Sequence, residues 1–182
     1  MGTHYFFALP IQPELRQMLE QVSHEVDLDL FKHIVYPEDY HVTLAFLGDA
    51  SEEQLSSLHE QLSDVVTTFP PFELKAERIA AFGREKQPRV LYASVQINAW
   101  LDKLHRAVVH ACSKSGFIVD QREYRPHITL AKKWRDSNKE ITPDWPTLIC
   151  DSQEVSCLNL YKVAPTEKPR YQVVRTYAFN KL

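Results

Sequence analysis

The ratio of strand-like to helix-like segments is the sequence feature that most constrains the fold of this chain. Short segments rich in apolar, β-branched and aromatic residues are interrupted by few helical repeats, in the predicted order β-α-β-α-β-β-α-β-β-β. A parallel sheet needs a helix between nearly every pair of strands, whereas antiparallel strands need only turns. The pattern therefore predicts an α+β protein with mainly antiparallel sheets.

Capping and turn residues mark the boundaries of these segments. Ser51 and Gln54 form a capping box before a helical stripe, another helix opens at Pro13, and Gly116 lies where a helix C-terminal cap is expected. Residues 134–146 are polar and interrupted by proline, which predicts a long surface loop. The expected strands are Tyr5–Pro10, Tyr40–Leu47, Phe72–Phe82, Val90–Val95, His127–Lys132, Glu154–Lys162 and Tyr171–Phe179.

Composition and charge exclude several classes of protein. With 182 residues, of which 44% are hydrophobic and 25% charged, the chain can bury one sizeable core or two small lobes, which excludes disordered and coiled-coil proteins. The net charge of −3 provides no molecule-wide positive field for long duplex nucleic acid. The few glycines are too scattered for a G-x-G-x-x-G turn or a phosphate loop, which excludes the common loop-based nucleotide hydrolases.

Cysteine usage and hydropathy indicate the compartment. Cys112, Cys150 and Cys157 are odd in number and lack a C-x-x-C spacing, which is typical of a reduced cytosolic protein. The N-terminus carries no basic region followed by a long apolar stretch, and no apolar run reaches the roughly 18 to 20 residues that span a bilayer. We therefore expect a soluble, cytoplasmic protein without a membrane partner.

A four-residue pattern occurs twice and carries the chemical signal. His41-Val42-Thr43-Leu44 returns 86 residues later as His127-Ile128-Thr129-Leu130, and each copy falls on an expected strand. Because side chains alternate between the faces of a strand, histidine and threonine share one face in each copy while the apolar residues share the other. One face can therefore belong to the core and the other to a reactive site.

The paired histidines and threonines suit phosphodiester cleavage by in-line attack. With an ordinary pKa near 6.5, one imidazole can act as general base towards water while the other, protonated, acts as general acid towards the leaving oxygen. Threonine hydroxyls can bind the non-bridging phosphate oxygens, and this scheme needs no metal. Either copy alone is more often a half-buried strand with a structural histidine, but the repetition favours catalysis. The other histidines show no zinc-site spacing, so we predict no metal and no cofactor.

The chain resembles a known family, the two-histidine phosphoesterases. Within this family it is most similar to the branch of RNA 2′,3′-cyclic phosphodiesterases, which are also called 2′-5′ RNA ligases. The resemblance spans nearly the whole chain. The segments that carry it are Tyr5–Pro10, Tyr40–Gly48, Arg89–Tyr92, Arg125–Leu130 and a final strand near Tyr171.

The resemblance implies both a fold and an activity. The fold is a single two-lobed domain over residues 1–182, with two pseudo-symmetric lobes of mainly antiparallel sheet, flanking helices, and the active site in the central cleft. The activity is metal-independent hydrolysis of RNA 2′,3′-cyclic phosphate ends to 2′-phosphates, with a weak reversible joining of 2′-5′ RNA linkages. The expected partners are RNA ends or small cyclic nucleotides, and no obligatory protein partner is evident.

The resemblance also implies roles for individual residues. His41 maps to the proton donor towards the leaving 3′ oxygen and His127 to the proton acceptor, although the reverse assignment stays open. Thr43 and Thr129 map to the phosphate-binding positions. Many relatives carry an arginine three residues after the second threonine, where this chain has Lys132.

Three further residues are weaker candidates for substrate binding. Strict alternation places Lys132 on the opposite face from His127, so only a twist or bulge would aim it inward, and Lys133 competes for the role. Phe7 can stack on the terminal base, although such a residue is more often core. Arg125 can approach the RNA backbone, although an exposed arginine there is usually only solvated.

Other functions remain open on the sequence alone. A sister enzyme of the same fold could act on ADP-ribose cyclic phosphate or on 2′-5′ oligoadenylates, and the motifs do not separate these substrates. A non-catalytic RNA-end binding module would not need an acid and a base together, which argues against it. A structural or interaction domain would require the two motifs to coincide by chance.

Overall fold

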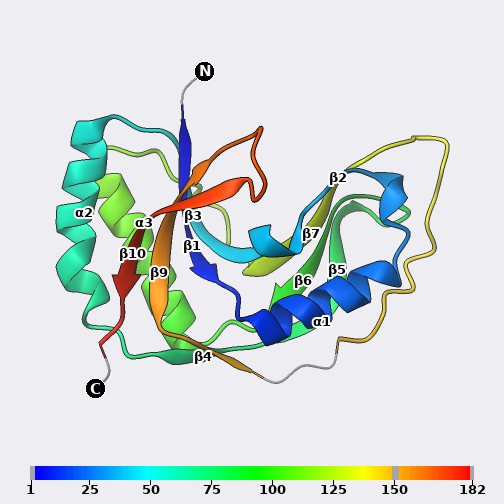
Figure 1. Ribbon diagram of the computed structural model, residues 1–182, viewed down its shortest axis with the longest axis horizontal. Coiled ribbons are helices and arrows are strands. Elements are labelled where there is room, and N and C mark those ends of the chain that lie inside the picture. Colours follow the sequence, from blue (N-terminus) through cyan, green and yellow to red (C-terminus); the bar gives the residue numbers. More distant parts are fainter. Residues whose placement is uncertain (1–2, 149–151, 181–182) are drawn as a thin grey trace.

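The computed structural model describes residues 3–148 and 152–180, which form an α+β architecture built on one large antiparallel sheet (Figure 1). The helices are α1 (Pro13–His24), α2 (Glu52–Val66) and α3 (Ala99–Lys114). The strands are β1 (His4–Pro10), β2 (Phe31–Ile34), β3 (His41–Asp49), β4 (Phe72–Leu74), β5 (Ala76–Arg84), β6 (Gln87–Val95), β7 (His127–Trp134), β8 (Gln153–Val155), β9 (Cys157–Val163) and β10 (Tyr171–Ala178). The predicted fold class is confirmed.

The large sheet consists of two parts that meet at one point. Its strand order is β10-β9-β1-β3-β7-β6-β5, and β2 pairs with the outer part of β7. Among the described residues, β3 and β7 are joined through a single register pair, Val42 opposite Ile128. The strands β10, β9, β1 and β3 therefore form one part, and β2, β7, β6 and β5 form the other. The two repeated motifs lie at the junction of the two parts.

The helices pack their apolar faces against a core that extends through both parts of the sheet. Helices α2 and α3 contact each other and pack near β3 and β10, whereas α1 lies towards the opposite end of the sheet (Figure 1). The predicted capping box is present, since the Ser51 side chain accepts from the Gln54 backbone and the Gln54 side chain accepts from the Ser51 backbone. Gly116 has φ +81°, which confirms it as a left-handed residue after α3.

Several boundaries differ from the sequence prediction because tertiary pairing decides them. The expected strand Phe72–Phe82 is divided in two, since β4 pairs with β8 while β5 pairs with β6. The expected strand Glu154–Lys162 is divided for the same reason. Strand β2 was missed because three of its four residues are exposed, so it has no alternating pattern.

Two expectations about the compartment can be compared with the described residues. Cys112 and Cys157 are free thiols, while Cys150 lies outside the described residues. Within residues 3–148 and 152–180, no helix has the length and apolar character needed to cross a bilayer.

Candidate active site

The two repeated motifs lie on adjacent ends of β3 and β7 with the alternation that the sequence predicts. Val42 and Ile128 are fully buried, and the leucines that follow them are at most 4% exposed. The histidines and threonines of both motifs are half-buried on the opposite face. Because Val42 is paired with Ile128, the two reactive faces lie next to each other at the junction of the sheet.

A tyrosine hydrogen bond links the two motifs across the junction. The Tyr124 hydroxyl, just before β7, donates to the Thr43 carbonyl at 3.1 Å. Its ring stacks on His105 of α3 with centroids 3.7 Å apart. Burial raises the pKa of Tyr124, so the hydroxyl stays protonated and remains a donor at neutral pH. This contact fixes the approach of the second motif to the first.

Both histidines are held by the same backbone contact, which determines their reactive nitrogen. Nδ1 of His41 lies 2.7 Å from the Asp39 carbonyl, and Nδ1 of His127 lies 2.7 Å from the Arg125 carbonyl. A carbonyl oxygen only accepts, so Nδ1 carries the hydrogen in both rings. Nε2 is therefore the nitrogen that can take up or release a proton. Nε2 of His41 also lies 3.1 Å from the Thr43 hydroxyl.

Burial makes both imidazoles weak bases in the free protein. Burial, opposed by the hydrogen bond to the Asp39 carbonyl and assisted by the charges of Lys132 and His127, lowers the pKa of His41 to about 4. Burial also lowers the pKa of His127, as does the charge of Lys132, again against a carbonyl hydrogen bond. Both rings are thus neutral at pH 7 until an anion arrives.

A β-bulge brings Lys132 onto the histidine face. Thr129 pairs with Tyr92, but Ala131 pairs with Leu91, so Leu130 is the extra residue on β7 and the alternation reverses there. Lys132 is consequently half-buried beside the site, and burial lowers the pKa of its ammonium. Lys133 is exposed and has φ 61°, so it does not share this face. Of the two lysines, the structure places Lys132 towards the histidines.

The first motif carries the same bulge. Thr43 pairs with Ala8 while Ala45 pairs with Phe7, so Leu44 is the extra residue on β3. The repeat therefore extends over five residues, His-x-Thr-Leu-Ala, in sequence and in backbone conformation. At the position equivalent to Lys132, β3 carries Phe46, which is 54% exposed. The two parts of the site are thus alike in frame and different in chemistry.

The comparisons with known proteins agree with this geometry. The family model for LigT-like phosphoesterases matches residues 9–92, which include the first motif. An RNA 2′,3′-cyclic phosphodiesterase of Bacillus subtilis is 32% identical over 176 residues, which cover 94% of this chain and 93% of the relative. This chain belongs to the LigT-like, two-histidine phosphoesterases.

Further relatives of this phosphoesterase extend the comparison. A protein of the same description from Geobacillus stearothermophilus is 33% identical over 178 residues, 96% of this chain and 57% of its own length. The crystal structure of Escherichia coli LigT in complex with 3′-AMP superposes with a TM-score of 0.84 over 100% of both chains at 23% identity. This structural similarity to LigT supports the fold of the chain.

The structure corrects the prediction for Phe7 in this phosphoesterase. Phe7 is fully buried and packs edge-on against Tyr177 in the core, so it has no surface on which a base could stack. Its pairing with Ala45 places it on the apolar side of the sheet. Phe6 is the residue of β1 that faces the site, with its ring centroid 4.9 Å from that of His41. The periodicity of the sequence could not show which of the two adjacent phenylalanines, Phe6 or Phe7, faces the histidine site.

Aromatic side chains that the sequence prediction missed surround both histidines. Tyr171 of β10 packs edge-on against His41 at 5.1 Å, and Phe6 stacks on Tyr161 at 5.2 Å. Phe82 and Tyr92 stack on each other and pack edge-on against His127 at 5.3 and 5.2 Å. These walls explain the burial that lowers both histidine pKa values.

The remaining predicted residues have less specific surroundings. Thr129 shares the face of His127 and is half-buried. The Arg125 side chain is exposed and forms an ion pair with Glu123 at 2.8 Å, so the contact of residue 125 with the site is made by its carbonyl. No group of three or more His, Cys, Asp or Glu side chains suited to a metal ion occurs in the described part of the chain.

Asp39 is a buried carboxylate that positions the wall beside His41. It is 3% exposed, and its two oxygens accept the backbone N–H groups of Arg170 and Tyr171 at 3.1 Å each. Its own carbonyl holds His41. One residue therefore fixes both the imidazole and the start of β10.

Replacing Asp39 with asparagine is expected to lower the free energy of unfolding by about 1 to 3 kcal/mol, because the amide nitrogen cannot accept one of the two N–H groups. Urea denaturation followed by circular dichroism measures this loss. The matched control is Asp64→Asn on the exposed face of α2, which should leave stability within about 0.5 kcal/mol. Equal stability of the two variants would mean that the buried carboxylate is dispensable.

Proposed function

We propose that this phosphoesterase hydrolyses 2′,3′-cyclic phosphate ends of RNA to 2′-phosphates with His41 and His127 as its proton-transfer pair. The observation that carries the proposal is the shared hydrogen bond from Nδ1 to a carbonyl, which leaves two Nε2 atoms to handle protons at one junction. Lys132, whose charge acts on both rings, supplies the positive potential that a phosphate requires.

In the proposed reaction each group has one task. Nε2 of His127 takes a proton from water, and the water oxygen bonds to phosphorus opposite the 3′ oxygen. As the bond from phosphorus to the 3′ oxygen breaks, Nε2–H of His41 donates its proton to that oxygen. The product has a 2′-phosphate and a free 3′-hydroxyl. Thr43 and Thr129 bind the non-bridging oxygens, and Lys132 offsets their growing negative charge.

The proposed donor role of His41 depends on substrate binding. A pKa of about 4 leaves His41 neutral in the free protein at pH 7. A bound phosphate anion favours the charged imidazolium and raises this pKa, so the proton enters with or after the substrate. The same pair can act on a 5′-hydroxyl in place of water, which would join two RNA ends through a 2′-5′ linkage. We propose this ligation as a minor activity that is reversed by cleavage of the 2′-5′ linkage back to the cyclic phosphate.

The relatives support the choice of substrate and the setting. The curated relatives are described as RNA 2′,3′-cyclic phosphodiesterases, and solved structures of E. coli LigT are described as complexes with 3′-AMP and ATP. One continuous core extends through both parts of the sheet, which supports a single two-lobed domain over residues 1–182. We place the activity in the cytoplasm on the cysteine pattern.

A comparison of substrates tests this proposal. We expect kcat/KM for a short RNA with a 2′,3′-cyclic phosphate end to exceed, by at least about tenfold, the values for ADP-ribose cyclic phosphate and for 2′-5′ oligoadenylate. Chromatography of the three reactions at equal enzyme concentration measures the ratios. A higher kcat/KM for either alternative would replace RNA ends as the substrate. Binding of RNA ends without turnover would mean that the protein is a non-catalytic RNA-end binding module.

The pH dependence of kcat/KM is expected to be bell-shaped with its optimum below pH 6.5. The two limbs of the kcat/KM profile report the two histidines of the free enzyme. Both histidine pKa values are lowered in the free enzyme, so both limbs lie below the ordinary histidine pKa of about 6.5. The kcat optimum should lie at higher pH, because the bound anion favours protonated imidazole. Initial rates between pH 4 and 9 measure both curves, and a flat kcat/KM profile from pH 5 to 9 would argue against two titrating histidines.

A further inference from the structure

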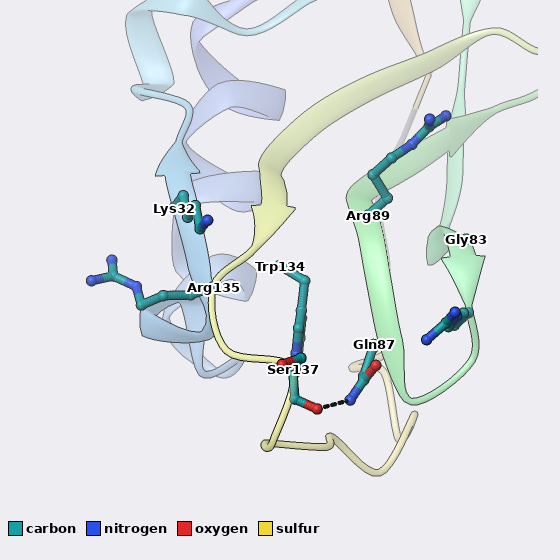
Figure 2. Close-up of a pocket in the computed structure, with 8 residues that line it drawn as sticks. Lys32, Gly83, Gln87, Arg89, Trp134, Arg135 and Ser137 are labelled. Carbon is teal, nitrogen blue, oxygen red and sulfur yellow. Dashed lines mark hydrogen bonds between the residues drawn. The ribbon is translucent and has the colours of Figure 1, made fainter.

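A pocket away from the two histidines opens where β7 separates from β6. Pairing between these strands ends at Val90 and Lys132, whereas β7 stays paired with β2 as far as Trp134, opposite Phe31. The left-handed conformation of Lys133 marks the point of separation. The pocket has a volume of about 580 Å³ and lies between the end of β7 and the β5–β6 hairpin (Figure 2).

The lining of this pocket is strongly basic. Lys32 comes from β2, Arg84 from β5, Arg89 from β6, and Arg135 directly follows β7. Figure 2 shows Lys32 and Arg135 on one side of Trp134 and Arg89 on the other side. No aspartate or glutamate is among the residues that line it. Four elements thus converge with one sign of charge in a chain whose net charge is −3.

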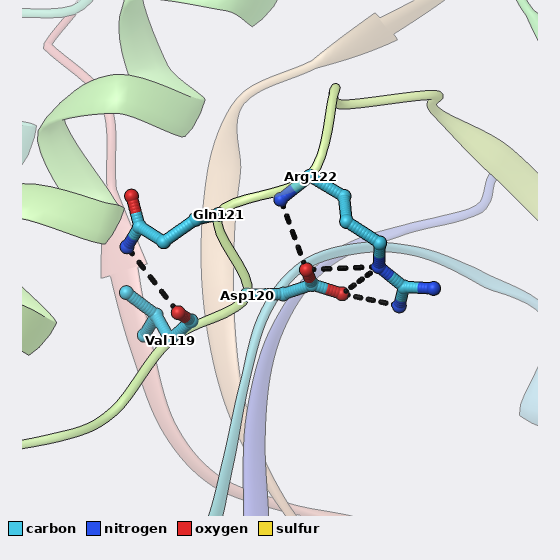
Figure 3. A network of polar contacts seen from close by, with 4 residues as sticks. All are labelled: Val119, Asp120, Gln121 and Arg122. Carbon is cyan, nitrogen blue, oxygen red and sulfur yellow. Dashed lines mark hydrogen bonds and ion pairs between the residues drawn. The ribbon is translucent and has the colours of Figure 1, made fainter.

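The four pocket cations have no carboxylate partner among the described residues, unlike two arginines in the loop before β7. Arg122 forms hydrogen bonds and an ion pair with Asp120 in the loop before β7 (Figure 3). Arg125 pairs in the same way with Glu123. Among the residues that the structure describes, none of the four pocket cations forms an ion pair. Arg135 donates to the carbonyl of Phe31, which leaves its charge uncompensated.

Neighbouring contacts hold the pocket in shape. The side-chain nitrogen of Gln87 donates to the carbonyls of Ser137 and Lys139 at 2.7 and 3.1 Å, which fastens the segment after β7 to the β5–β6 hairpin (Figure 2). The Trp134 indole also donates to the Lys139 carbonyl, at 3.2 Å, and to that of Asp136 at 2.8 Å. The β5–β6 hairpin and the segment after β7 are therefore held together at the edge of the pocket.

The pocket lies at the far end of the strand that carries the second motif. Lys132 shares a face with His127, and the left-handed Lys133 and then Trp134 follow it at the end of β7. His127 and Trp134 are the two ends of this 8-residue strand, which places the pocket roughly 20 Å from the histidine. A strand of RNA whose cyclic end lies at His127 would reach this distance several nucleotides upstream.

We propose that this pocket binds a backbone phosphate of the substrate RNA upstream of its cyclic end, through Lys32, Arg84, Arg89 and Arg135. The inference rests on the proposed function and adds a preference for substrates longer than one nucleotide. Cations beside a half-buried indole suit single-stranded nucleic acid, because phosphates meet the charges while a base can contact the ring. The pocket would thus select the length of the substrate, while the histidine site selects the chemical end.

Kinetics with two substrate lengths test the proposal. In the double variant R84A/R89A, kcat/KM for a hexanucleotide ending in a 2′,3′-cyclic phosphate should fall on the order of tenfold, while kcat/KM for 2′,3′-cyclic AMP stays within about twofold. The salt dependence for the hexanucleotide should also flatten, with a slope of log(kcat/KM) against log salt reduced by about 0.7 for each lost phosphate contact. The matched control is R106A/K114A on α3, which removes the same charge from an exposed helix face.

The outcomes separate this proposal from the proposed function. An equal loss for both substrates, or no loss for the hexanucleotide, would overturn the pocket proposal while the wild-type activity stands. If the wild type hydrolysed neither substrate, the proposed function would fail instead. Fluorescence anisotropy with the labelled hexanucleotide would then decide the pocket separately, since weaker binding in R84A/R89A than in the control supports it and equal binding contradicts it.

Discussion

Replacing either His41 or His127 with alanine is expected to lower kcat for a cyclic-phosphate RNA by on the order of 10² to 10⁴-fold, the usual range for the loss of one general acid or base. Each ring offers a single Nε2 for proton transfer because its Nδ1 is bound to a carbonyl. Within the two His-x-Thr-Leu-Ala motifs, His41 and His127 are the histidines with this contact between Nδ1 and a backbone carbonyl. Single-turnover rates for the two variants measure the loss.

The control for this prediction is His110→Ala, which removes an exposed histidine of α3. Its kcat should match the wild type, and circular dichroism should show all three variants folded. The double variant of His41 and His127 should lose about as much as either single variant, because the pair acts as a unit. Full activity in either folded single variant would remove that histidine from the mechanism.

Replacing Lys132 with glutamine is expected to lower kcat/KM by roughly 10² to 10³-fold, comparable to the loss of one preorganised group that stabilises negative charge in the transition state. Its charge also acts on both histidines, whose pKa values it lowers. Without this charge both pKa values rise, so both limbs of the pH profile should move to higher pH. Initial rates over the full pH range measure the two effects together.

The adjacent Lys133→Gln variant is the matched control for Lys132. It removes the same charge one residue later, from an exposed side chain at φ 61°. Its kcat/KM should stay within about threefold of the wild type. Lys132→Arg should retain more activity than Lys132→Gln, since charge is kept. A larger loss for Lys133→Gln than for Lys132→Gln would mean that the bulge does not bring Lys132 to the phosphate.

Much of the site could be predicted from the sequence because alternation and repetition are local signals. The spacing of His41 and Thr43 required only that each motif lie on a strand with one buried face, and Val42 and Ile128 confirm this. The α+β class followed from the scarcity of helices between strands. The capping box at Ser51 is equally local and is present in the structure.

The remaining features depend on register, which sequence patterns do not encode. Phe6 and Phe7 look alike in sequence, and only the pairing of β1 with β3 determines which of them faces His41. The inward position of Lys132 depends on the bulge at Leu130, which strict alternation cannot foresee. Asp39 acts through backbone groups of a strand far away in the chain. Long-range pairing therefore decided what the local pattern left open.

Phosphorus NMR of the reaction product, in EDTA, tests the central claim most directly. A short RNA with a 2′,3′-cyclic phosphate end is incubated with the wild type, with His41→Ala and with His127→Ala. The account predicts a 2′-phosphate from the wild type and an unchanged cyclic phosphate in both variants. A 3′-phosphate would contradict the proposed loss of the 3′ oxygen. A 2′-phosphate formed equally by the folded variants would contradict the assignment of these two histidines as the proton-transfer pair.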